Sequence, residues 1–195
     1  NNIELIFPEI FISLSIMFLL ILGVFKKKSS KIIHNFSLLV LSITAVITFN
    51  ETISVNPTTL FNESIVIDYL SSLMKIITLL AAFVVLLISS NYLRTFKIFK
   101  IEYPILILSS VLGMMIMISS NDLIVFYMGL ELQSLALYVL ATFNRDQLKS
   151  SEAGLKYFVL SALSSGLLLY GCSLIYGFTG STNFNIIATQ LNSNE

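Results

Sequence analysis

Long apolar segments, separated by short polar ones, run through most of this 195-residue chain. A membrane-spanning helix needs about 20 mostly apolar residues, because the hydrocarbon layer is about 30 Å thick and each helical residue rises about 1.5 Å. Lipid offers the backbone no hydrogen-bond partner, so such segments must be helices unless they alternate strictly, as membrane strands do, and that alternation is absent. The qualifying segments are 5–25, 32–49, 69–90, 103–120, 123–143 and 156–178. We therefore predict an all-α integral membrane protein with six transmembrane helices.

The basic residues gather in every second connection between these segments. The connections that hold nine of the eleven Lys and Arg are 26–31, 94–100 and 145–149. The connections that hold acidic residues but no Lys or Arg are 50–68, 121–122 and 179–195. Because positive residues are retained on the inner face of a membrane, we expect the basic connections inside and both termini outside. This alternation independently supports the count of six, since losing or adding one helix would disrupt it.

Composition narrows the class of protein further. The chain is 56% hydrophobic and 11% charged, whereas soluble domains are about 45–50% apolar and about 25% charged. This apolar content leads us to expect membrane lipids as partners. The net charge is zero, so we expect no nucleic acid as a partner. One cysteine excludes an internal disulfide, and the chain holds no Walker A or GxGxxG motif, so we expect no cofactor in it. The single histidine, His34, follows a basic loop; we expect it to be solvated at the interface, with no metal site.

One acidic residue lies deep in an apolar segment. Glu131 is near the middle of 123–143, where a carboxylate costs about 2.5 kcal/mol or more on membrane insertion scales. Helical spacing places Tyr127, Ser134 and Tyr138 on the same side, which predicts a polar lining that faces protein or water. A residue with such a cost is retained where it has a function or a binding partner, so we interpret Glu131 as a proton-handling group. The alternative is a carboxyl that only hydrogen-bonds helices together.

Two cations also lie outside the basic connections. Lys156 opens the last predicted helix, with Glu152 one turn before it in the favourable order for an ion pair; proton transfer and a plain helix-end pair are both open from spacing alone. Lys75 lies about a turn and a half into 69–90, and we expect it to snorkel to the outer face. The small residues Ser161, Ala162, Ser165 and Gly166 predict close helix packing.

Two stretches carry a resemblance to a known family. SNDLIVFYMGLELQSLALYVLATF at 120–143 and SSEAGLKYFVLSALSSGLLLYGCSLIYGFTGSTNF at 150–184 closely resemble NADH–ubiquinone oxidoreductase chain 2, the mitochondrial counterpart of bacterial subunit N in respiratory complex I. The opening FPEIF resembles the start of that family, and the rest of the first hundred residues match it mainly in hydropathy.

This resemblance implies a fold of fourteen helices with two inverted repeats. Residues 1–100 would be three preceding helices, 101–178 the first helices of the first repeat, and 179–195 a polar outer-face tail or loop. The family's proton-translocating glutamate and lysine fall on Glu131 and Lys156. The further lysines lie on later helices, so we expect a fragment, or a split subunit whose remaining helices a second chain carries.

The resemblance also implies the setting. The chain would be a non-redox subunit of the NADH:ubiquinone reductase, next to other membrane-arm subunits; NADH, FMN, iron–sulfur clusters and ubiquinone would be bound elsewhere in the complex. Residue usage favoured by AT-rich codons hints at an organellar gene, so we expect the mitochondrial inner membrane before the bacterial plasma membrane. The alternatives are a subunit of a multi-subunit cation/proton antiporter and a non-catalytic structural subunit.

Overall fold

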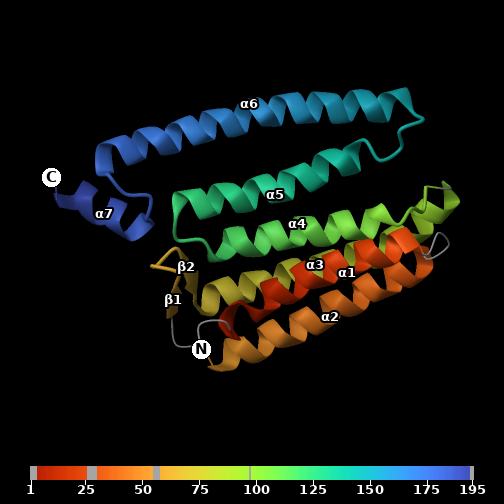
Figure 1. The fold of residues 1–195 in the computed structure, drawn as a ribbon, viewed down its shortest axis with the longest axis horizontal. Helices are drawn as coiled ribbons and strands as arrows, with labels where there is room; N and C mark the ends of the chain where they lie inside the picture. The colour runs from red at the N-terminus through yellow and green to blue at the C-terminus, as the bar shows by residue number, and fades with distance from the viewer. Residues whose placement is uncertain (1–3, 26–29, 55–57, 97, 194–195) are drawn as a thin grey trace.

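Six long helices, a short hairpin and a final short helix make up the chain in a computed structural model, which describes residues 4–25, 30–54, 58–96 and 98–193 (Figure 1). The long helices are α1 (Phe7–Phe25), α2 (Ser30–Ser54), α3 (Tyr69–Thr95), α4 (Glu102–Ser119), α5 (Leu123–Ala141) and α6 (Leu148–Thr179). The other elements are the 3-10 turn η1 (Glu4–Ile6), strands β1 (Thr58–Leu60) and β2 (Ile65–Ile67), and helix α7 (Phe184–Ser193). All six long helices are long and apolar enough to cross a membrane, which confirms the predicted spans.

The first four long helices pack around one apolar core. Its fully buried members include Ile12 of α1, Leu41 of α2, Leu79 of α3 and Leu108 of α4. Leucine and isoleucine dominate these positions. Lipid tails are as apolar as these side chains, so helices in a membrane associate mainly through close packing and not through the hydrophobic effect. Outward-facing residues of the same helices are also apolar, as a helix facing lipid requires. The three N-terminal helices and α4 therefore form a compact bundle.

Helix α5 lies against α4, and α6 lies beyond α5 (Figure 1). The three-residue connection 120–122, one residue longer than the predicted 121–122, folds α5 back antiparallel to α4 (Figure 1). The carboxylate of Asp122 caps α5 by accepting from the backbone N–H of Ile124 at 2.8 Å. Helix α6 is exposed along most of its length. None of the residues in its most apolar stretch is buried, and Gly154 is its one buried residue.

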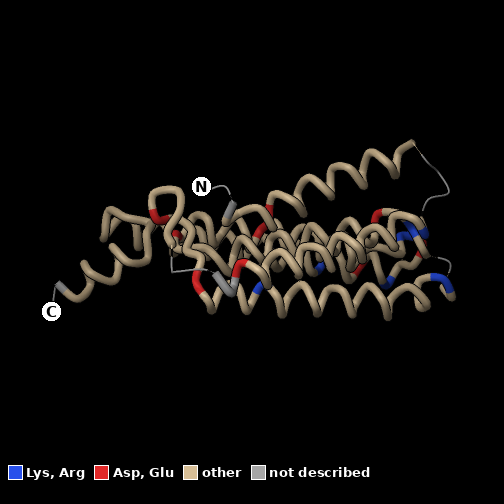
Figure 2. The backbone as a smooth tube through the Cα atoms, turned by 90° about the horizontal axis from the view of Figure 1, so that it is seen from below, with Lys and Arg blue, Asp and Glu red and all other residues tan. Residues whose placement is uncertain are grey.

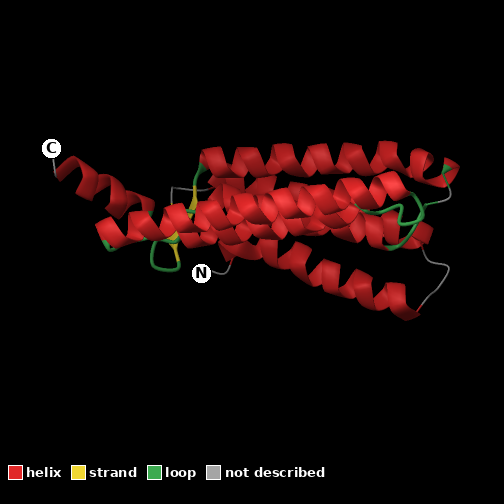
Figure 3. Cartoon of the chain, turned by 90° about the horizontal axis from the view of Figure 1, so that it is seen from above, coloured by secondary structure: helices red, strands yellow, loops and turns green. Residues whose placement is uncertain are grey.

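A hairpin that the sequence pattern did not predict lies between α2 and α3. Strands β1 and β2, yellow in Figure 3, pair antiparallel, and their turn places Phe61, Asn62 and Glu63 at positive φ. The carbonyl oxygen of Glu63 accepts from the side-chain amides of Asn121 at 2.8 Å and Asn183 at 3.1 Å. These bonds hold the hairpin, the α4–α5 turn and the start of α7 together at one end of the bundle.

The charges separate along the bundle. Most of the described Lys and Arg gather at the end away from the hairpin, whereas the start of α1 and helix α7 lie on the hairpin side (Figures 1 and 2). This agrees with the predicted alternation of basic and acidic connections. Four of the basic residues that carried that prediction, Lys26, Lys27, Lys28 and Lys97, lie outside the described residues.

Candidate functional site: intramembrane charged residues

Glu131 lies in the middle of α5, at the ninth of its 19 residues. Its side chain is partly buried, and its Oε1 atom is buried without a hydrogen-bond partner among the described residues. A buried, unsatisfied carboxylate oxygen is costly. We therefore expect that another group, or a bound proton, satisfies this oxygen in the working protein.

The predicted polar lining lies around Glu131 as helical geometry requires. Tyr138 is buried, and its ring meets the rings of Tyr157 and Phe158 on α6 edge-on, at 4.9 Å and 5.7 Å between centroids. The hydroxyl of Ser134 donates to the Leu130 carbonyl of its own helix at 2.6 Å. Tyr127 is half-buried on the same side. The face of α5 that carries Glu131 is thus the face that α6 meets near Tyr138.

Lys156 is not at the start of its helix. Helix α6 begins at Leu148, because the stretch from Leu148 to Gly154 contains no proline and little else that would stop a helix. Lys156 therefore lies two turns in, where its Nζ atom pairs with Glu152 Oε1 at 2.6 Å while both side chains stay mostly exposed, at 67% and 55%. No hydrogen bond or ion pair joins Lys156 to Glu131 in the part of the chain that the structure describes. Further along α6, a Cβ atom on Gly166 would have nothing within 4 Å of it. The described helices therefore do not cover the small-residue face of α6 on which close packing was predicted.

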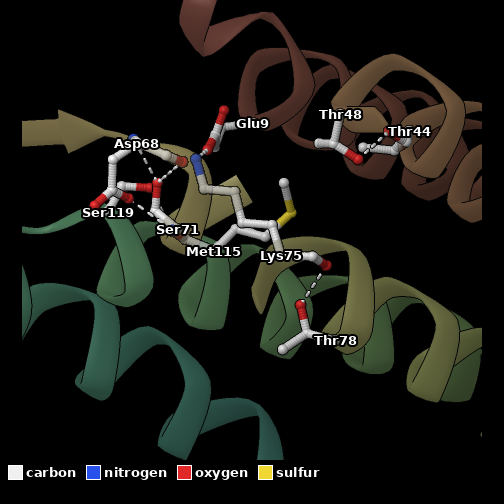
Figure 4. A network of polar contacts seen from close by, with 9 residues as sticks. All are labelled: Glu9, Thr44, Thr48, Asp68, Ser71, Lys75, Thr78, Met115 and Ser119. Atoms are coloured by element: carbon white, nitrogen blue, oxygen red, sulfur yellow. Dashed lines mark hydrogen bonds and ion pairs between the residues drawn. The ribbon is translucent and has the colours of Figure 1, made fainter. Parts of the chain in front are cut away.

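Lys75 does not snorkel, and that expectation is wrong. Its Nζ atom lies 2.6 Å from Glu9 Oε1, with the two side chains 4% and 10% exposed. Figure 4 shows the lysine reaching across from α3 to the carboxylate of α1. The only indication of this pair in the sequence was that Glu9 lies in the first turn of one apolar segment and Lys75 in the second turn of another. Pairing them requires knowing that the two helices are neighbours.

His34 also differs from its prediction as a solvated interfacial residue. It is 3% exposed on α2, with its ring 5.6 Å from that of Phe99. The guanidinium carbon of Arg94 lies 5.1 Å from the centroid of the same Phe99 ring. The loop after α3 folds back over the start of α2 and removes the imidazole from solvent. Within the described residues, no group of His, Cys, Asp and Glu is arranged to hold a metal ion.

Comparisons with known proteins place these residues in a family. The profile described as the transmembrane family "NADH:quinone oxidoreductase/Mrp antiporter" matches residues 120–195. NADH-quinone oxidoreductase subunit N of Pelagibacter ubique is 69% identical over 99% of this chain and 41% of its own length. The subunit N of Maricaulis maris is 48% identical over 99% of this chain and 40% of its own length. The chain thus spans about two fifths of the curated relatives it matches.

Solved structures agree in fold. A chain of respiratory complex I from Thermus thermophilus superposes with a TM-score of 0.77 and 26% identity, over 90% of this chain and 38% of that one. A chain of the membrane-bound sulfane sulfur reductase, an archaeal respiratory membrane complex, gives a TM-score of 0.85 over 100% of this chain and 41% of that one; its identity of 22% shows the fold alone. We therefore identify the chain as a relative of NADH-quinone oxidoreductase subunit N, matched along almost its whole length to the N-terminal part of that antiporter-like membrane subunit.

Proposed function

We propose that this chain supplies the N-terminal helices of a proton-translocating subunit of respiratory complex I, which couples NADH:quinone oxidoreduction to proton pumping. The observation that carries the proposal is Glu131, an acid in the middle of an apolar helix, whose buried Oε1 has no hydrogen-bond partner in the part of the chain that the structure describes. Its setting in a chain 69% identical to a subunit N supports it. Because the relatives named above are bacterial, we place the complex in a bacterial plasma membrane in preference to the mitochondrial inner membrane.

In the proposed mechanism Glu131 stabilises a protonated lysine contributed by the rest of the subunit. Two opposite charges a few ångströms apart in a low-dielectric interior interact strongly enough to change which groups hold protons. Weakening that ion pair releases the proton of the lysine. Glu131 acts as the ionised partner, Lys156 is the candidate relay, and Tyr127, Ser134 and Tyr138 line the path. Neither Glu131 nor Lys156 takes part in electron transfer, and quinone reduction occurs elsewhere in the complex.

The exposed α6 supports a further part of the proposal, which concerns partners. Its apolar residues are bare, and the matched relatives are more than twice as long as this chain. We propose that the remaining helices of the subunit, on a second chain or a longer form of this one, pack on α6, and that other membrane-arm subunits surround them. The division at residues 100 and 178 into preceding helices, first repeat and tail stays a prediction within this scheme.

A cation/proton antiporter subunit is the second candidate. The family profile that matches residues 120–195 is described for Mrp antiporters as well as for NADH:quinone oxidoreductase. Such a subunit would use Glu131 but assemble without a redox arm. The close sequence match is to subunit N, and it favours complex I.

The test is Glu131→Gln in the assembled membrane complex, with Glu63→Gln, an exposed acid of the hairpin turn, as the matched control. We expect the Glu131 variant to assemble and to lose most quinone-coupled proton pumping, while the control pumps normally. Normal pumping by Glu131→Gln would leave only a structural role for the residue. Pumping that depends on sodium and not on quinone would favour the antiporter.

A further inference from the structure

A pocket with two basic residues in its lining opens at the end of the bundle where Lys and Arg gather (Figure 2). It has a volume of about 210 Å³ and is lined by residues of α1, α4 and α5 and of the segments next to α4 and α5. Lys100 lies just before α4 and Arg145 follows α5. The antiparallel packing of these two helices therefore brings both cations to one pocket, apart from the Glu131 site.

Neither cation of the pocket is neutralised by an acid. Lys100 and Arg145 are both exposed, and no ion pair within the described residues includes them or Glu102, the acid of the lining. The ammonium group of Lys100 instead lies 5.7 Å from the centre of the Phe143 ring, a contact that holds the charge in place without cancelling it. Two cations and one acid leave the pocket with one net positive charge.

The wall of the pocket next to these charges is apolar and faces outward. Leu20 on α1 and Val139 on α5 are 48% and 47% exposed, and Leu106 on α4 is half-buried. All three lie inside spanning helices, whereas Lys100 and Arg145 lie just beyond the helix ends. Charge and apolar surface therefore follow one another in the order in which a lipid carries its headgroup and its acyl chains.

The position of the pocket in the membrane indicates what binds there. The basic connections are expected on the inner face, where basic pockets between spanning helices bind acidic lipid headgroups. A free phosphate ion would contact the cations but leave the apolar wall uncovered, whereas a phospholipid covers both. Helix α6, on which the remaining helices are proposed to pack, lies on the opposite side of α5 from α1 (Figure 1), so those helices do not account for the pocket.

We propose that this pocket binds an acidic phospholipid of the inner leaflet, with its phosphate between Lys100 and Arg145 and its acyl chains along α1, α4 and α5. One phosphodiester charge balances the net charge of the lining, and Glu102 opposes the phosphate. The bound lipid joins α1 to the end of α5, the helix that carries Glu131. The site uses none of the residues of the proposed proton path, so it stands whether or not Glu131 translocates protons.

The test uses the assembled membrane complex in detergent micelles and a phosphatidylglycerol whose acyl chain carries a photoreactive diazirine. Crosslinked peptides are located by mass spectrometry, and we expect them to contain Leu20, Leu106 or Val139. Excess unlabelled phosphatidylglycerol should prevent this crosslinking, whereas phosphatidylcholine and inorganic phosphate should not. Equal competition by phosphatidylcholine would show that headgroup charge is not recognised, and competition by phosphate would show a site for a free anion. A lack of crosslinks at these positions would show that protein covers the pocket. Each of these three results would overturn the proposal.

Charge variants at exposed positions test the roles of the individual residues. Lys100→Gln and Arg145→Gln should each raise the apparent Kd for the probe about fivefold, since each removes one cation near the headgroup. Glu102→Gln should lower it, because a repulsion is lost. Lys149→Gln, which removes an exposed cation of α6 that does not line the pocket, is the matched control and should leave it unchanged.

The control and the acid variant separate a defined site from the general positive charge of the inner face. If Lys149→Gln weakened binding as much as Arg145→Gln, or if Glu102→Gln did not strengthen it, the pocket would have no special role and the proposal would fail. Glu131→Gln is expected to bind the probe like the wild type, so loss of lipid binding and loss of proton translocation are measured separately.

Discussion

Gly113 of α4 and Gly129 of α5 face each other so closely that neither position has room for a methyl group. A Cβ atom on Gly113 would lie 2.6 Å from the backbone nitrogen of Gln133, and one on Gly129 would lie 2.8 Å from that of Met117. The obstructing atoms are backbone, which cannot rotate away. This contact fixes how α5, and therefore Glu131, is placed against the N-terminal bundle.

Gly113→Ala is expected to destabilise the chain by about 1–3 kcal/mol, because α4 and α5 must separate to admit the methyl group. The loss would be measured as a shift of the unfolding curve of the purified chain in mixed micelles. Gly166→Ala is the matched control, because nothing lies within 4 Å of that position. There, alanine should be neutral or stabilising by up to about 1 kcal/mol. Equal stability of the two variants would contradict the close contact.

The Glu9–Lys75 pair makes a second stability prediction. Lys75→Met alone leaves a buried carboxylate uncompensated and is expected to cost about 3–5 kcal/mol, whereas the double variant with Glu9→Gln should be close to neutral. Unfolding of the four members of this double-mutant cycle measures the difference. Additive losses would show that the two side chains do not interact in the folded chain.

The bonds at the hairpin end give a third prediction. Asn121→Ala removes a donor to the Glu63 carbonyl while Asn183 keeps its own bond to that oxygen. We expect a loss of about 1 kcal/mol and faster proteolysis of the β1–β2 turn, whose residues have positive φ. Asn185→Ala, at an exposed position of α7, is the control. Unchanged proteolysis of the Asn121 variant would show that the hairpin is held by other contacts.

The lengths of the apolar segments were enough to predict the six helices. Each spanning segment must match the thickness of the membrane and must form a helix to satisfy its backbone hydrogen bonds. The acidic and basic connections predicted which helix ends lie together. The hairpin was not predicted, since TTL and IVI are too short to show alternation. The start of α6 was placed eight residues late, because the polar residues before Lys156 are good helix formers outside the apolar window.

Charge pairing was predictable only within a helix. The Glu152–Lys156 pair follows from spacing along one helix, and the structure confirms it. The Glu9–Lys75 pair depends on which helices are neighbours and on their register, information that a single sequence does not carry. For the same reason the burial of His34 was missed, because it depends on Phe99 folding back over α2.

Lys156→Met separates a relay from a surface ion pair. The Lys156–Glu152 pair is exposed, so its loss should cost less than about 1 kcal/mol. A loss of pumping in the assembled complex could then not be attributed to unfolding. We expect pumping to fall several-fold while assembly and quinone reduction persist, because a methionine cannot carry a proton between Glu131 and the next basic group. Lys149→Met, at another exposed lysine in the first turn of α6, should pump normally. If both variants pump normally, Lys156 only pairs with Glu152, and the proton path from Glu131 leads elsewhere.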